Sequence, residues 1–507
     1  MNSTNKSQNL SNYQVLALNA KYSLINSISV SAVYFICSVL LARYLGAKEL
    51  GIIVITNYLL VFINCVFGND LSGVKLISQH KSQEHNVYVI LKGMLCYTIL
   101  FSLACTLGLL TLYWIPSKFI ANNIRPYLLS ITIIVVMNLF LGLWSSFWDG
   151  FQRMDWAMTT SIIPQTIKAL SFVLLILGGF GLKSFLWAWA GIWGIYPVII
   201  LPLIFWIFIK KKKLIQNTTK TSFPHQDYLI YGFFLKIPGL LKSLAPLAIS
   251  LYLGHIMMDT YEIGIFGVAC TLASLVTVLT LPIGRALFPN LSRSHSEGDN
   301  AYLIDASTKA YRYLGLFVVV LITALILLRE HIISLLYGKE FYKAVEIIIF
   351  LGIAFFFDSM KTISSVILNA TDNASSVTKI EILGTILLFI TGSILISSFG
   401  IKGAAITITI ASVFTSVLTF LTAEKLTKIR NRPFLYKSLL ALFAFGIVPY
   451  LRVNAFFSYI SILITILFFI RGITLSEIYN LTNLILGRVP KQNEQCCFFR
   501  KNSFNIP

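Results

Sequence analysis

Long apolar runs separated by short polar stretches form the main pattern of this chain. Many of the runs extend over about 18 to 25 residues, and a helix needs ~20 apolar residues to cross the hydrocarbon core of a bilayer. A chain in lipid must pair its backbone polar groups within its own segment, which favours helices. Membrane strands would instead give ~10-residue segments of alternating polarity. The pattern therefore predicts an all-α integral membrane protein.

The runs predict about 14 transmembrane helices. The expected spans are residues 16–42, 50–70, 87–115, 126–148, 158–179, 185–209, 236–254, 264–289, 309–328, 344–368, 380–398, 403–424, 435–450 and 455–473. Clear polar stretches separate some of them. Two short breaks, at 180–184 and 399–402, depend instead on glycine, which often ends a helix.

One short turn occurs twice. Residues 180–183 read Phe-Gly-Leu-Lys, and 219 residues later residues 399–402 read Phe-Gly-Ile-Lys. The same shift places Ser145-Ser146 on Ser364-Ser365, and it aligns a span, a turn and a second span in the same order. The repeat indicates that one helical unit is present in two copies.

A second, shorter match links the start of each copy. "RYLGAKELGI" at 43–52 resembles "LYLGHIMMDTYEIGI" at 251–265, with an insertion of five residues. Glu49 and Gly51 then correspond to Glu262 and Gly264. Each copy holds six spans, an even number, so both copies enter the membrane from the same side. Parallel repeats of this kind commonly form two bundles around a site at mid-membrane depth.

The repeat divides the chain into six segments. We expect a cytoplasmic tail, a six-helix N-terminal lobe, a cytoplasmic linker, a six-helix C-terminal lobe, two additional transmembrane helices and a second cytoplasmic tail, at residues 1–15, 16–209, 210–235, 236–424, 425–473 and 474–507.

Positive charge predicts the orientation. The chain carries 40 Lys and Arg against 20 Asp and Glu, and charged residues make up only 12% of it. The loops on one side, with both termini, hold 19 of these cations, and those on the other side hold 10. Cytoplasmic loops are enriched in Lys and Arg, so both termini should be cytoplasmic. Because the charge is spread over many loops, nucleic acid is not an expected partner.

The sequence contains little that is typical of an enzyme. The six histidines are scattered without the spacing of metal ligands, and no Gly-rich phosphate-binding motif is present. The seven cysteines lie in apolar runs or in the tail, without the pattern of a disulfide framework. We therefore expect no catalytic residue, no metal and no cofactor. The protein should be a transporter and not an enzyme.

Cations inside the expected spans are the unusual feature. A charge at the bilayer centre costs ~2.5–3.5 kcal/mol on insertion scales, so it should face a cavity or a partner instead of lipid. A cationic cavity would suit an anionic substrate such as a lipid diphosphate. The deeper candidates are Lys21, Lys168, Lys242, Arg285 and Lys361.

One carboxylate lies beside these cations in the sequence. Asp358 precedes Lys361 by three residues within an expected span, so both side chains share one helix face and can meet. Two interpretations stay open for this pair. It is either a structural ion pair, or Lys361 binds the anionic head group while Asp358 holds or releases it during the cycle.

Several stretches resemble Wzx-type polysaccharide flippases of the multidrug/oligosaccharidyl-lipid/polysaccharide (MOP) superfamily. The stretches are "ALNAKYSLIN", "LLARYLGAKELGI", "PIGRALFPNLSR", "LLYGKEFYKAV" and "SSFGIKGAAI". The resemblance covers about residues 15–425. It implies two six-helix lobes around a V-shaped cleft, alternating access, and a polyprenyl-diphosphate-linked oligosaccharide as substrate for O-antigen or capsule assembly. Relatives carry basic residues in the cleft, a role that Lys21, Lys242 and Arg285 could fill.

Three functional hypotheses remain open at this stage. The first is a flippase for undecaprenyl-diphosphate-linked oligosaccharides, which could contact a polysaccharide polymerase and other assembly proteins. The second is a cation-coupled small-molecule exporter of the multidrug type with the same fold. The third is a polytopic membrane polysaccharide polymerase, against which the short loops argue.

Overall fold

The structure is a computed structural model of the 507-residue chain. It describes residues 2–68, 73–74, 76–77, 84–114, 123–151, 153–200, 202, 232–278 and 280–427. Every secondary-structure element assigned within these ranges is helical. The all-α prediction is therefore confirmed.

In the first half of the chain, the described residues form five α-helices. A short 3₁₀ helix, η2 (Arg125–Tyr127), precedes α4, and a π-helical turn, η3 (Tyr196–Ile200), continues α6. The five are α1 (Asn2–Phe67), α3 (Glu84–Thr111), α4 (Leu128–Gly150), α5 (Met154–Leu177) and α6 (Leu182–Ile195).

Between residues 232 and 427, the described part of the second half forms six α-helices with short elements between them. The α-helices are α8 (Gly232–Met257), α9 (Tyr261–Ser274), α10 (Thr280–Ser296), α11 (Asn300–Ile332), α12 (Ala344–Ala370) and α13 (Ala374–Thr427). The short elements are η5 (Leu275–Thr277), η6 (Ile333–Tyr337) and η7 (Lys339–Phe341).

Two of these helices, α1 and α13, each cover two expected spans. In each of them a glycine bends the chain between the first span and the second. In α1 the break is Gly46, with φ of 76°, and in α13 it is Gly400, with φ of 55°. Only glycine adopts such positive φ angles readily. Gly400 belongs to the turn that the repeat analysis singled out, and Gly46 lies in the stretch that matches 251–265.

Eight helices of the described part are long and apolar enough to cross a membrane. Together with α6, α9 and α10 they overlap all twelve spans expected between residues 16 and 424. The linker expected at 210–235 lies outside the described residues except for its last four, which begin α8. The two spans at 435–450 and 455–473 and the C-terminal tail also lie outside the described residues. The fold is thus a multi-pass helical bundle, in which the number of 14 spans stays a prediction.

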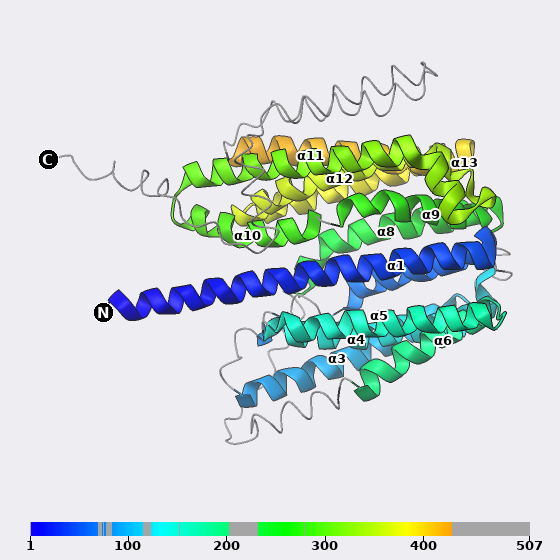
Figure 1. The fold of residues 1–507 in the computed structure, drawn as a ribbon, viewed down its shortest axis with the longest axis horizontal. Helices are drawn as coiled ribbons and strands as arrows, with labels where there is room; N and C mark the ends of the chain where they lie inside the picture. Colours follow the sequence, from blue (N-terminus) through cyan, green and yellow to red (C-terminus); the bar gives the residue numbers. More distant parts are fainter. Residues whose placement is uncertain are drawn as a thin grey trace, which may run out of the picture.

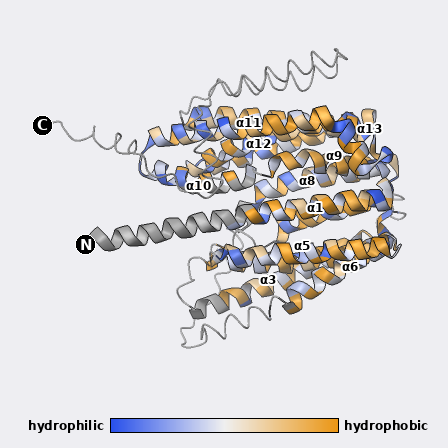
Figure 2. Ribbon diagram, viewed as in Figure 1, coloured by the Kyte–Doolittle hydropathy of each residue, from blue (hydrophilic) through white to orange (hydrophobic). Residues whose placement is uncertain are grey.

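The helices form two halves that lie side by side (Figure 1). The two halves meet where α1 of the first contacts α8 and α9 of the second. Helices α3 to α6 lie on one side of α1. On its other side α10 follows α9 and also contacts α1, and α11 to α13 lie beyond these helices. Apolar residues cover most of the helix surfaces, as expected for a bundle in lipid (Figure 2). The largest buried apolar cluster includes residues of both halves.

The two ends of the bundle differ in the elements that they carry. Gly46 lies against Glu340 of η7, and Gly400 lies against Met257 at the end of α8. We name this the Gly46 end. The N-terminus and the turn between α10 and α11 lie at the opposite end (Figure 1), which we name the N-terminal end.

Candidate functional site

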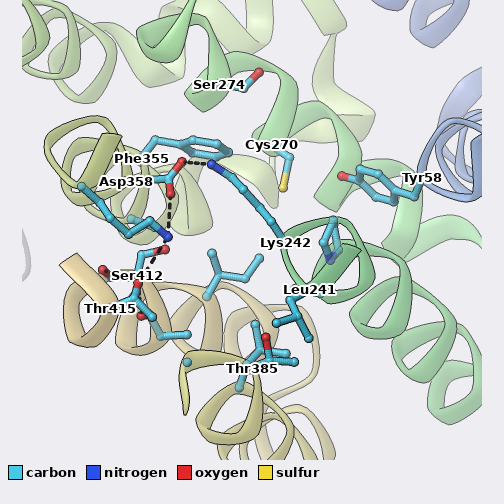
Figure 3. A pocket seen from close by; sticks show the side chains of 18 of the residues that line it. Tyr58, Leu241, Lys242, Cys270, Ser274, Phe355, Asp358, Thr385, Ser412 and Thr415 are labelled. Carbon is cyan, nitrogen blue, oxygen red and sulfur yellow. Dashed lines mark hydrogen bonds and ion pairs between the residues drawn. The ribbon is translucent and has the colours of Figure 1, made fainter. Parts of the chain in front are cut away.

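A cavity of about 300 Å³ lies where the two halves meet. Helix α1 contributes Tyr34 and Tyr58, and the remaining walls come mainly from α8, α9, α12 and α13. Figure 3 shows Lys242 and Asp358 pointing toward one another across this space. Asp358 is the fifteenth of the 27 residues of α12, so the site lies near the middle of that helix.

Four charged side chains form a chain of ion pairs in this cavity. The Lys242 Nζ lies 2.8 Å from Asp358 Oδ2, and the Lys361 Nζ lies 3.2 Å from Asp358 Oδ1. The Lys361 Nζ also lies 3.0 Å from Glu381 Oε1 and donates a longer hydrogen bond, 3.4 Å, to Thr415 Oγ1. Asp358 and Lys361 therefore meet, as their spacing of three residues predicts.

The two lysines differ in how far water can reach them. The side chain of Lys361 is 8% exposed, whereas that of Lys242 is 57% exposed. Moving the Lys361 ammonium to another partner would cost more free energy than moving that of Lys242. Lys361 is buried between two largely buried carboxylates, which would lose their partner. Lys242 is thus the cation of this group that can reach a ligand at the lower cost.

Two lysines and two carboxylates give this group no net charge. The sequence analysis emphasised cations and so missed Glu381, the second carboxylate. A signal was available, because an acidic residue inside an expected membrane span is as costly as a basic one. The position of Glu381 relative to Lys361 depends on how α12 and α13 pack, which the sequence pattern does not give.

Of the other expected cations, the structure describes only the side chain of Lys168. Lys168 of α5 does not join the ion pairs and lines a second, smaller cavity beside the first. The side chains of Lys21 and Arg285 lie outside the described part of the structure. Their role in a cationic cleft stays a prediction.

Polar contacts join the two halves at the Gly46 end. The backbone N–H of Ala47, just after the bend at Gly46, donates to Glu340 Oε1 at 2.8 Å. The Lys48 Nζ lies 3.5 Å from Asp259 Oδ1, and the Thr260 hydroxyl donates to the carbonyl oxygen of Lys48 at 2.7 Å. These contacts close this end of the space between the halves.

Two further contacts order the same end. The Arg43 Nε donates to the carbonyl oxygen of Leu336 at 2.8 Å, which again joins the two halves. Within the second half, the Lys343 ammonium donates to Glu262 Oε1 at 2.8 Å, and this bond raises the pKa of Lys343 above its ordinary value. The Gly46 end is therefore held by several polar contacts from both halves.

Comparison with known proteins defines the family. The model of the polysaccharide biosynthesis protein family matches residues 40–346, more than half of the chain. The chain is also 23% identical to the uncharacterized membrane protein MJ1068 of Methanocaldococcus jannaschii over 415 residues, which cover 76% of this chain and 79% of that protein.

Two solved structures show the fold. The lipid II flippase MurJ in an inward closed conformation has a TM-score of 0.63 and 17% identity, covering 92% of this chain and 99% of that one. An inward-facing MATE family multidrug resistance transporter of the MOP superfamily has a TM-score of 0.61 and 14% identity, covering 81% and 94%. These two proteins are transporters and not enzymes.

The chain belongs to the polysaccharide biosynthesis protein family, and it has the multi-pass fold of MOP superfamily transporters. The resemblance that the sequence motifs indicated is thereby confirmed at the level of family and fold. The cavity between the halves is the candidate functional site of this fold.

Proposed function

We propose that the protein is a flippase that moves polyprenyl-diphosphate-linked oligosaccharide units across the bacterial inner membrane by alternating access, for O-antigen or capsule assembly. The family links the chain to polysaccharide biosynthesis. The observation that carries the proposal is the cavity between the halves, with the exposed ammonium of Lys242 inside it.

The ion pairs suggest how an anionic head group could be bound and released. A diphosphate oxygen that enters the cavity would form charge-assisted hydrogen bonds with the Lys242 ammonium. Asp358 would then keep Lys361 as its second partner, 3.2 Å away. When the diphosphate leaves, Lys242 returns to Asp358. The carboxylate thus competes with the substrate for Lys242, which keeps binding reversible.

Lys361 has a different role in this proposal. Two carboxylates surround its ammonium, and its side chain is buried. Lys361 therefore positions Asp358, and the contact with the substrate is made by Lys242. This role replaces direct head-group binding by Lys361, one of the two possibilities that its spacing from Asp358 had suggested.

We propose the orientation from the positive charges, with both termini and the linker at 210–235 in the cytoplasm. The Gly46 end then faces the periplasm. Polar contacts from both halves hold that end together, which supports the interpretation of this structure as a state closed toward the periplasm. Polysaccharide polymerase and other assembly proteins are the proposed partners at the membrane.

Depleting the protein in its own host tests the proposal. Lipid-linked single repeat units should accumulate on the cytoplasmic leaflet, and surface polysaccharide should be lost. Accumulation on the outer leaflet would instead indicate a polymerase. Normal surface polysaccharide with altered drug tolerance would indicate the small-molecule exporter.

Point variants in the depleted strain test the site itself. Lys242→Gln should express normally but restore surface polysaccharide poorly. The matched control is Lys309→Gln, which breaks another Lys–Asp pair of 2.8 Å, the exposed i,i+4 pair with Asp305 outside the cavity. Full restoration by Lys242→Gln would contradict the role of Lys242.

A further inference from the structure

Lys168 is a buried lysine surrounded by aromatic rings. Its side chain extends from the middle of α5, and the residue is 4% exposed. Its Nζ lies 4.5 Å from the ring centre of Trp189, 5.1 Å from that of Trp193 and 6.0 Å from that of Phe172. Cation–π contacts at these distances favour the charged ammonium.

No carboxylate accompanies this ammonium among the described residues. Its Nζ donates no hydrogen bond to a described protein acceptor, and it forms no ion pair with a described residue. Lys361, the other buried lysine, has two carboxylates and a hydroxyl around it. A buried cation is normally paired, so Lys168 is short of an anion.

A small cavity of about 30 Å³ lies beside Lys168. Helix α1 lines it with Ser38 and Asn57, and α9, from the other half of the molecule, lines it with Thr271. Such a volume accepts about two water-sized particles. It is large enough for a halide ion and too small for a diphosphate group.

The indole of Trp189 adds a second unused donor to this wall. Trp189 lines the same cavity, and its Nε1 is buried without a hydrogen-bond acceptor in the described part of the chain. Buried donors ordinarily have a partner. An ammonium and an indole N–H that both lack an acceptor are what an anion-binding site offers.

We propose that the Lys168 cavity binds a small monovalent anion of halide size. The anion supplies the negatively charged partner that the described residues do not give to Lys168. It lies between α1 and α5 of the first half and α9 of the second half, so its binding stabilises the arrangement in which the two halves are packed together. This site is separate from the ion-paired cavity around Lys242, and the inference does not depend on which substrate is transported.

The thermal stability of the purified full-length protein tests the proposal. Chloride and bromide are compared with gluconate at constant ionic strength and pH. The apparent Tm of the wild type should rise saturably with either halide. Lys168→Met should lose this rise, while Lys242→Met, which removes a lysine that already has a carboxylate partner, should keep it.

Fluorescence gives a second readout, because Trp189 and Trp193 flank the ammonium. Iodide should quench a saturable part of the tryptophan emission in the wild type, and this part should be lost in Lys168→Met. Caesium, a cationic quencher, should show no component that depends on Lys168. The exposed Trp114 contributes only collisional quenching, which rises without saturation.

A cavity-filling variant keeps the test decisive even if Lys168→Met fails to fold. Ser38→Val retains Lys168 but occupies part of the cavity, and it should also lose the halide response. A wild type that shows no saturable halide response in either measurement overturns the proposal, as does an unchanged response in folded Lys168→Met or Ser38→Val. A Lys168-dependent rise in Tm with pyrophosphate and not with halides would also overturn it, because it would assign Lys168 to a larger anion.

Discussion

Gly51 of α1 and Gly264 of α9 lie at the contact of the two halves, each against the backbone of the other helix. A Cβ atom on Gly51 would lie 2.0 Å from the carbonyl oxygen of Thr260, and one on Gly264 would lie 1.9 Å from that of Ala47. Ala47 and Thr260 each precede the glycine of their own helix by four residues. The contact is therefore reciprocal, as expected for two copies of one unit related by a pseudo-two-fold axis.

Replacing either glycine by alanine should separate the two helices. The atoms in the way belong to the backbone and cannot rotate aside, so the cost should reach or exceed the ~1–3 kcal/mol typical of overpacking. We expect Gly51→Ala and Gly264→Ala to lower the apparent Tm of the purified protein by several degrees.

Gly191→Ala is the matched control for these two variants. Gly191 is also helical, but a Cβ on it would meet no atom of the described residues within 4 Å beyond its own helix backbone. Its apparent Tm should stay the same or rise slightly, because alanine favours helix over glycine. Equal Tm values for all three variants would show that the close packing at Gly51 and Gly264 is not required.

Glu340 should stabilise the Gly46 end by capping a helix of the other half. Its carboxylate accepts from the backbone N–H of Ala47, at the start of the second leg of α1. Loss of a helix cap costs about 0.5–2 kcal/mol. Glu340→Ala should therefore lower the apparent Tm, with Glu340→Gln intermediate because an amide oxygen can still accept the bond.

Glu297→Gln provides the comparison for Glu340. Glu297 forms an i,i+4 pair with Arg293 in which both side chains are more than half exposed. Such surface pairs contribute little, so this variant should match the wild type. A Glu340→Ala protein as stable as Glu297→Gln would remove the capping role.

Lys361→Leu should destabilise the protein more than the double variant Lys361→Leu/Glu381→Leu, which removes the lysine together with one of its two carboxylates. The single variant leaves Glu381, whose side chain is only 14% exposed, without its partner, and breaking a fully buried ion pair costs about 3–5 kcal/mol. In Lys361→Leu/Glu381→Leu no lone carboxylate remains, because Asp358 keeps Lys242 at 2.8 Å. We expect this double variant to express better and to have the higher apparent Tm.

A second double variant, Asp358→Leu/Lys361→Leu, removes Asp358 and keeps Glu381, so it distinguishes the roles of the two carboxylates. This double replacement would leave Glu381 without Lys361 and Lys242 without its carboxylate, so we expect it to be the less stable of the two double variants. The two double variants are compared by size-exclusion profile and thermal stability, and an advantage for Asp358→Leu/Lys361→Leu would contradict the four-residue arrangement.

Reporter fusions test the orientation. Fusions after Lys213 and after Arg432, both outside the described residues, should report cytoplasm, and a fusion after Lys339 should report the periplasm. A cytoplasmic signal after Lys339 would change the parity of the preceding spans. It would then contradict the model of two parallel six-span units.

The sequence determined the features that follow from local composition. Apolar runs near the length of a bilayer core require helices, because lipid offers no partner to unpaired backbone groups. The repeated turns predicted two copies, and Gly46 and Gly400 provide the bends with positive φ. The spacing of Asp358 and Lys361 placed them on one face, since a helix turn fixes which residues are neighbours.

Only the tertiary structure decided how the charges are paired. Lys242 joins Asp358 from 116 positions away, Glu381 reaches Lys361 from a neighbouring helix, and Lys168 lies apart among aromatic rings. A sequence pattern gives the face of each helix but not which faces are opposed, because that depends on how the side chains of several helices fit together. The net charge and the accessibility of the cavity follow from that packing, and so does the difference between Lys242, Lys361 and Lys168.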